Sequence, residues 1–185
     1  MVEPITALRL DLERYLALYP AERSRVDRFR RLLDEGSRAF SRERREGHLT
    51  ASAWVLDPPR RRVLLVHHRK LGKWLQPGGH ADGDPDLLRV ARREVLEETS
   101  VETTAPEGPR LFDLDVHPIP LHGETPAHEH FDVRFLLVAT ASTEPVGNDE
   151  THEARWVPLE DLEGFTGEES MLRMRDKAQE LLAVN

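Results

Sequence analysis

The sequence contains no cysteine, which excludes disulfide bonds, thiolate metal sites and cysteine nucleophiles. It also lacks any apolar run near the roughly 20 residues that a membrane-spanning helix needs. Its start, MVEPITALRLDLERYL, has no basic residues followed by an apolar core, as a secretory signal would have. From these absences we expect a soluble, cytoplasmic protein that has no membrane partner.

An excess of positive charge is absent as well, since the 185 residues carry a net charge of -8. Residues 1–46 hold 11 arginines against 9 acidic residues, whereas the rest of the chain holds 15 basic and 25 acidic residues. Binding to nucleic acid needs a basic stripe that displaces counterions from phosphates. We therefore expect no nucleic-acid partner, although an acidic body can handle small phosphorylated molecules when divalent cations mediate the contact.

Hydrophobic spacing separates an N-terminal extension, residues 1–46, from the main body, residues 47–185. In the extension, apolar side chains recur at helical spacing on both sides of Pro20, which predicts a helical hairpin. Its last part, from residue 37, is charged and is expected to be a plain connection. Such a hairpin suits dimerisation or packing against the body, so the sequence allows a homodimer.

The main body alternates between strand-like and helical patterns. Strands are expected at residues 49–56, 61–68, 110–117, 129–139 and 154–157, helices at 86–98 and 168–182, and loops at 70–85 and 118–127. Strands interleaved with helices predict an α/β domain in which a mixed β-sheet lies between helices.

The helix expected over residues 86–98 carries three acids near its end. They stand at positions i, i+3 and i+4 of one face and are Glu94, Glu97 and Glu98. In the preceding turns the same sector of the helix is apolar, at Leu87, Val90 and Ala91. A glutamate face that served only solubility should lie opposite the apolar stripe. We therefore expect the three carboxylates to point into a cleft.

Residues beside these acids suggest how a ligand is held there. Carboxylates at this spacing repel each other, and a hard cation such as Mg²⁺ or Mn²⁺ compensates the charge through oxygen ligands. Arg93 is expected to neutralise part of this charge or to contact the preceding acidic loop, although an ordinary surface arginine fits the spacing equally well. Before the helix, Gly78 and Gly79 allow close approach of the backbone to an anionic ligand. His80 follows directly and is placed to contact a substrate phosphate or a metal-bound water.

Together these residues resemble the Nudix box, the signature of Nudix hydrolases, G-x5-E-x7-R-E-U-x-E-E-x-G-U, in which U is a bulky aliphatic residue. Gly79 matches the first glycine. The further matches at the required spacing are Arg93, Glu94, Val95, Glu97, Glu98 and Val101. Two positions depart, because Pro85 replaces a glutamate and Ser100 replaces a glycine. Three aspartates are alternative partners for the arginine of the box: Asp82, Asp84 and Asp86.

The resemblance implies an α/β/α sandwich that hydrolyses the phosphoanhydride bond of a nucleoside diphosphate linked to another moiety, with Mg²⁺ or Mn²⁺ as cofactor. It implies a small nucleotide-type substrate, contacted by Gly78 and His80. The metal ligands that it implies are Glu94, Glu97, Glu98 and the carbonyl of Gly79. The catalytic residues that it implies are Glu98, Glu94 and Arg93, with Glu98 or Glu94 as the general base. In some family members the base comes from a distant loop, for which the candidates are Asp149, Glu150 and Glu153.

Two other functions remain open at this point. The departures at Pro85 and Ser100 would also fit a non-catalytic Nudix-like module that binds a nucleotide and regulates a partner. The arginines of residues 1–46 alone would suggest a nucleic-acid regulator, although acidic residues alternate with them.

One predicted strand carries a second candidate group of ligands. His128 and His130 share a face with Asp132, which is a spacing typical of metal ligands. The outward polar face of a half-buried strand explains the same pattern equally well. Arg134 on this face is suited to a phosphate contact or to a surface ion pair.

Overall fold

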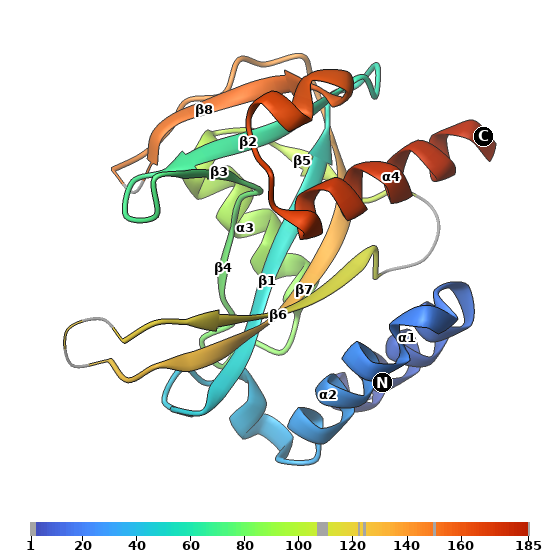
Figure 1. Cartoon of the computed structure of the whole chain (residues 1–185), viewed down its shortest axis with the longest axis vertical. Coiled ribbons are helices and arrows are strands. Elements are labelled where there is room, and N and C mark those ends of the chain that lie inside the picture. The colour runs from blue at the N-terminus through green and yellow to red at the C-terminus, as the bar shows by residue number, and fades with distance from the viewer. Residues whose placement is uncertain (1–2, 107–110, 122, 124, 150, 185) are drawn as a thin grey trace. The chain divides into compact units, whose positions relative to one another are not determined.

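The computed structural model describes residues 3–106, 111–121, 123, 125–149 and 151–184 (Figure 1). The backbone groups into two compact units, each drawn from three stretches of the chain. The first unit comprises Met1–Ser52, Gly78–Ala91 and Glu107–Phe135, and the second comprises Ala53–Pro77, Arg92–Pro106 and Leu136–Asn185. Three elements contribute residues to both units: β1 (Gly47–Leu56), α3 (Leu87–Thr99) and β7 (His128–Ala139).

The predicted N-terminal helical hairpin is confirmed and opens the first unit. Helix α1 (Pro4–Leu18) ends just before Pro20, and a 3-10 turn (Pro20–Glu22) leads into α2 (Arg23–Leu33). Proline suits the start of both α1 and the turn, because the first N–H of a helix has no partner within it. The two helices bury these apolar side chains: Leu8, Leu12, Tyr15, Leu16, Val26, Phe29, Leu32 and Leu33.

The strands of the first unit form a mixed sheet, as the sequence predicted. They are the first parts of β1 and β7 together with β4 (Gly78–His80) and β6 (Asp113–Ile119). β4 pairs antiparallel with β1, and β6 pairs antiparallel with β7. β1 and β7 are neighbours in the sheet. The amide of Glu129 donates to the carbonyl of Glu46, and further along both strands Thr50 donates to Asp132. Because the partner numbers rise together, β1 and β7 are parallel.

The second unit is built around β2 (Arg62–His68), which pairs antiparallel with strands on both of its edges. The four central residues of β2, 63–66, are fully buried, as expected for an interior strand. In helix α4 (Glu169–Val184), Met171, Met174 and Ala178 recur at helical spacing and are buried. The other elements of this unit are β3 (Lys73–Leu75), β5 (Thr103–Thr104), β8 (Thr151–Pro158) and a 3-10 turn (Leu159–Gly164).

Several short elements differ from the prediction. The segment expected as a loop at residues 70–85 contains two short strands, β3 and β4. The sequence did not predict them, because a strand of three residues is too short to show an alternating pattern. The charged segment after residue 36 includes a 3-10 turn, Gly36–Phe40, whose last two side chains are buried. Arg110, the expected start of a strand, lies outside the described residues, and the described strand begins at Asp113.

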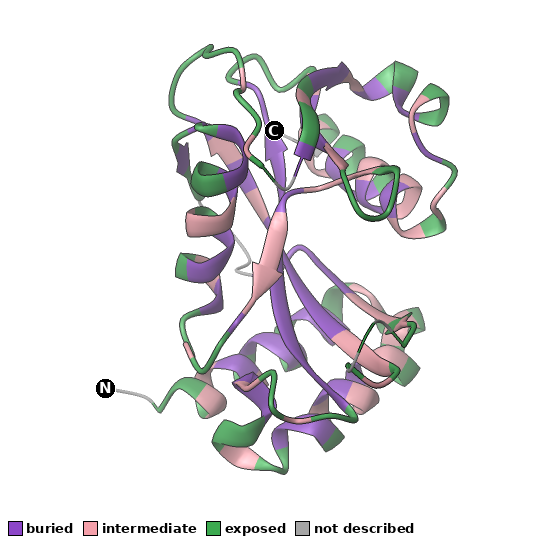
Figure 2. Cartoon of the chain, turned by 90° about the vertical axis from the view of Figure 1, so that its left-hand side faces the viewer, coloured by how far each residue is buried: buried purple, intermediate pink, exposed green. Residues whose placement is uncertain are grey.

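Most buried residues lie on the strands of the two units and on one side of the helices, while exposed residues concentrate on turns and on the other side of the helices (Figure 2). The predicted apolar face of β7 is buried at Phe131, Val133 and Phe135. The opposite face also carries buried side chains, since Asp132 and Arg134 are 4% and 3% exposed. The interpretation of that face as an outward polar surface is therefore wrong for these two residues. Among the described helices, none is long and apolar enough to cross a membrane.

Ser100, one of the two departures from the box, ends α3 in the left-handed conformation with a φ of 58°. Its amide donates to the carbonyl of Leu96 at 2.9 Å, so the helix closes in the way that a glycine would close it. The left-handed region costs an ordinary residue roughly 1–2 kcal/mol. We expect Ser100→Gly to raise the free energy of unfolding in urea by about 0.5–1 kcal/mol, since the greater freedom of glycine in the unfolded chain offsets part of that gain.

Ser142→Gly is the matched control, because Ser142 is exposed outside the helices and strands and has no positive φ. There, glycine only adds freedom to the unfolded chain, so the free energy of unfolding should stay equal or fall slightly. A Ser100→Gly variant that is less stable than the parent would contradict the argument.

Candidate active site

The three predicted acids of α3 lie in three different environments. Glu98 is buried at 5% exposure, the side chain of Glu94 is 17% exposed, and that of Glu97 is 60% exposed. Glu98 stands one turn after Glu94, and both continue the buried stripe that includes Val95. Glu97 lies at the edge of this stripe. The last turn of α3 therefore presents one shielded carboxylate and one that solvent reaches.

Arg93 contacts two of these acids. Its Nη2 donates to Oε1 of Glu94 at 2.6 Å, and its Nε lies 3.8 Å from Oε1 of Glu97. These contacts offset part of the negative charge on the helix face, which is one of the two roles that the sequence suggested. They also fix the orientation of the Glu94 carboxylate.

The loop of residues 146–149 lies against the last turn of α3. The amide of Val146 donates to the carbonyl of Thr99 at 2.8 Å, and the side-chain amide of Asn148 donates to the carbonyl of Glu97 at 3.1 Å. Asp149, one of the alternative bases, follows directly and is exposed. Of the other two, Glu153 pairs with Arg155 at 2.5 Å, and Glu150 lies outside the described residues.

The second departure from the box, Pro85, stands between two aspartates that build the start of α3. The amide of Arg89 donates to Oδ1 of Asp86 at 3.1 Å, so Asp86 caps the helix. Oδ1 of Asp84 accepts the amide of Asp86 at 3.0 Å and Nη2 of Arg89 at 2.7 Å. Asp82 pairs with Arg42. The aspartates thus organise the helix start without the glutamate that the box would place at this position.

The two glycines of the predicted ligand loop form β4 with His80. Gly78 lies opposite Ser52 of β1, and Gly79 lies opposite Ala51. A Cβ on Gly78 would be 2.3 Å from Cβ of Ser52, so glycine is required there by the close approach of two strands. This explains Gly78 by packing, whether or not a ligand also approaches its backbone.

His80 is half-buried and lies among other imidazoles. Its ring centroid is 4.9 Å from that of His130 and 5.2 Å from that of His48. Burial, and then the nearby charge of Arg42, lower the pKa of His80 to about 4. At neutral pH the ring is therefore uncharged, and it can meet a phosphate only as a neutral N–H donor.

A polar network covers the face of the first-unit sheet to which His80 belongs. Oδ1 and Oδ2 of Asp132 accept the hydroxyls of Thr50 and Ser52 at 3.0 and 2.7 Å. Nε of Arg134 also donates to Asp132, at 2.8 Å. Asp132 is thus bonded to two hydroxyls and a guanidinium. The sequence had grouped it with His128 and His130, but the residue that lies with these two histidines as a possible metal ligand is His48.

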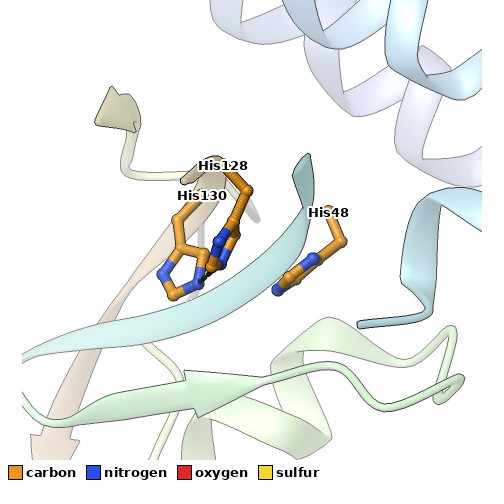
Figure 3. A group of neighbouring side chains, drawn as sticks. All are labelled: His48, His128 and His130. Atoms are coloured by element: carbon orange, nitrogen blue, oxygen red, sulfur yellow. Dashed lines mark hydrogen bonds between the residues drawn. The ribbon is translucent and has the colours of Figure 1, made fainter. Parts of the chain in front are cut away.

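In the described part of the chain, one group of side chains could hold a metal ion: His48, His128 and His130 (Figure 3). One possible ligand atom from each of the three lies within 4.8 Å of the others. The spacing of His128 and His130 along the sequence pointed to such a group. His48 was missed, because its partners become visible only when β1 and β7 are known to be parallel neighbours. The period-two alternation of His48, Thr50 and Ser52 is the signal that the sequence does contain.

Three arginines of the N-terminal extension line a hollow of about 290 Å³ in the first unit. Arg28 pairs with Glu129 at 2.5 Å, and Arg44 pairs with Glu35 at 2.6 Å. The residues that line the hollow are Arg28, Arg31, Leu32, Glu35, Arg44, Glu129 and Phe131. Since acids neutralise two of its three arginines, the hollow is not the continuous basic stripe that nucleic acid needs.

Comparison with known protein families gives one clear match. The model of the NUDIX domain matches residues 47–178, which is most of the chain. None of the curated proteins matches the sequence significantly.

The similarity to solved structures with the same fold extends over nearly the whole length of those chains. A NUDIX-family hydrolase from Clostridium perfringens is 25% identical, with a TM-score of 0.54, over 72% of this chain and 97% of that one. The C. elegans Ap4A hydrolase in a binary complex is 18% identical, with a TM-score of 0.53, over 74% and 98%. The E. coli dihydroneopterin triphosphate pyrophosphohydrolase is 14% identical, with a TM-score of 0.55, over 74% and 96%. The last two likenesses concern the fold alone.

Proposed function

The chain belongs to the NUDIX domain family, and from this premise we propose that it is a divalent-metal-dependent hydrolase of nucleotide-type substrates. The bond cleaved is the phosphoanhydride of a nucleoside diphosphate linked to another moiety. One observation carries the proposal: α3 ends with Glu98 buried and Glu94 beside it on the same stripe, where a merely solubilising acid would be exposed.

The donor set of α3 fits Mg²⁺ or Mn²⁺. Hard cations prefer carboxylate oxygens, and a helix holds such ligands rigidly. Glu94, Glu97 and Glu98 would hold the metal, with the carbonyl of Gly79 as a further ligand. When bound, the cation supplies charge neutralisation on the diphosphate and acidifies a coordinated water.

The residues of the chain have distinct tasks in the proposed reaction. A water attacks one phosphorus, Glu98 accepts its proton, and the bond from that phosphorus to the bridging oxygen breaks to give two phosphorylated products. Arg93 orients the carboxylate of Glu94 through its 2.6 Å hydrogen bond. Gly78 and His80 are proposed to contact the substrate phosphates, where His80 donates a neutral N–H.

A substrate panel tests the proposal. We expect the purified chain with Mg²⁺ or Mn²⁺ to release phosphorylated products from at least one compound in a set of dinucleoside polyphosphates, nucleoside triphosphates and nucleoside diphosphates linked to sugars. Products are separated by ion-exchange chromatography, and chelation by EDTA should abolish their release. Folded protein that releases nothing from any compound with either metal would exclude the hydrolase.

A non-catalytic module that binds nucleotides is the second candidate, since Pro85 and Ser100 depart from the box. Asp86, directly after Pro85, caps α3, and Ser100 adopts the conformation of the missing glycine, so both departures leave the helix intact. This favours the enzyme. Calorimetry that detects tight nucleotide binding by protein that forms no product would favour the module instead.

A further inference from the structure

The three imidazoles of His48, His128 and His130 meet where two parallel strands begin (Figure 3). His48 is the second residue of β1, and His128 and His130 are the first and third residues of β7. Side chains alternate along a strand, so these positions place all three rings on one face of the first-unit sheet. In Figure 3 the ring of His48 faces the other two.

Backbone carbonyls orient two of the rings. Nδ1 of His48 lies 3.3 Å from the carbonyl of Arg44, and Nδ1 of His128 lies 2.9 Å from the carbonyl of Pro126. A carbonyl can only accept a hydrogen bond, so each Nδ1 carries the proton and each Nε2 keeps its lone pair. Metal-binding histidines are commonly fixed in this way by the nitrogen that does not bind the metal.

The Nε2 atoms are the ones that an ion would share, and one possible ligand atom from each ring lies within 4.8 Å of the others. Nε2 of His48 is buried and has no hydrogen-bond partner among the described residues, which destabilises the folded protein unless something compensates. Nε2 of His128 and Nε2 of His130 are 3.2 Å apart. Two nitrogens bound to one tetrahedral zinc at about 2.0–2.1 Å are separated by about 3.3 Å. Without an ion, the same pair makes an N–H···N hydrogen bond.

A tetrahedral ion has a fourth position beside these three rings, and other imidazoles lie next to them. Among the described residues, His80 and His117 are candidates for it, with ring centroids 4.9 and 5.5 Å from that of His130.

We propose that His48, His128 and His130 form a zinc site that is separate from the carboxylates of α3. Imidazole nitrogens favour borderline cations such as Zn²⁺, whereas Mg²⁺ and Mn²⁺ prefer oxygen ligands. The ion satisfies the buried Nε2 of His48 and ties β1 to β7. Its role is to stabilise this end of the sheet, because binding to the folded state alone shifts the folding equilibrium.

Titration of chelator-treated protein without an affinity tag tests the site. Zn²⁺ is added in the presence of excess Mg²⁺, and binding is measured by calorimetry. Co²⁺ is added in parallel, and the visible absorption typical of tetrahedral cobalt is recorded. We expect the parent protein to bind a single equivalent of Zn²⁺. His130→Asn should weaken that binding roughly a hundredfold or more and remove the cobalt absorption.

Three further variants separate the site from packing and from the carboxylates. His48→Gln and His128→Gln should also lose Zn²⁺ binding, and circular dichroism shows that each variant is folded. Zn²⁺ should raise the melting temperature of the parent protein and leave that of these variants unchanged. His67→Gln is the control, because His67 stacks on Trp74 in the second unit. It should bind Zn²⁺ like the parent.

Two results would overturn the proposal. One is parent protein that binds no more Zn²⁺ than His130→Asn. The other is Zn²⁺ binding that is lost in Glu98→Gln and kept in the histidine variants, which would place the ion on α3. Since these readouts do not measure hydrolysis, they stand or fall independently of the proposed enzyme activity.

Discussion

Glu98→Gln is expected to lower turnover by roughly a hundredfold to ten-thousandfold without unfolding the protein. Glutamine has nearly the same size and shape, so it fills the buried position that Glu98 occupies at 5% exposure. It carries no negative charge and cannot accept the proton of the attacking water. The measurement is steady-state turnover at saturating metal on a substrate found with the panel.

The matched control is Glu102→Gln, three residues after the end of α3. Glu102 is exposed, and its backbone carbonyl accepts hydrogen bonds from the amide and the hydroxyl of Thr140. Its substitution should change turnover by less than about twofold. Equal urea midpoints for both variants and the parent would show that the fold is intact. Unchanged turnover in Glu98→Gln would remove this residue from the mechanism and direct attention to Glu94 or Asp149.

Long periodic segments of the fold could be predicted from the sequence. The helix expected at residues 86–98 is α3 (Leu87–Thr99), and the strand expected at 129–139 is β7 (His128–Ala139). Short strands could not, because they depend on their partners. β4 exists because Gly78 lets its backbone approach Ser52 closely, and nothing within β4 itself repeats.

The candidate site divides in the same way. Spacing along a single helix was enough to group Glu94, Glu97 and Glu98 on one face. Their different exposures also depend on what packs nearby, such as the loop whose Asn148 bonds the carbonyl of Glu97. That packing joins residues far apart in the sequence. His48 escaped notice for a similar reason, since its relation to β7 is set by strand order.

Arg134 shows most clearly how pairing across strands changes the role of a residue. The sequence suggested a phosphate contact or a surface ion pair, yet its side chain is 3% exposed. Nε donates to Asp132 at 2.8 Å, and Nη1 and Nη2 donate to Asp113 and Asp115 at 3.2 Å each. Burial disfavours its charge, but these aspartates outweigh burial and raise the pKa of the guanidinium above its ordinary value. Arg134 is therefore the centre of a buried charge network.

We expect Arg134→Met to lower the free energy of unfolding by about 3–5 kcal/mol. Methionine fills much of the space, but it leaves three carboxylates close together without the cation that they share. Arg134→Lys keeps the charge and loses the planar fork that reaches three acids at once, so its loss should be smaller. Urea denaturation of the two variants and the parent gives both values.

Arg14→Met is the matched control, because Arg14 is 71% exposed and pairs with Asp11, three residues earlier on the same helix. Solvent reaches this arginine from most sides although Asp11 is only 11% exposed, so the free energy of unfolding should change by less than about 1 kcal/mol. The order Arg14→Met, Arg134→Lys, Arg134→Met, from least to most destabilised, follows from burial and shared charge. A loss below about 1 kcal/mol for Arg134→Met would mean that the aspartates have enough other partners to dispense with the arginine.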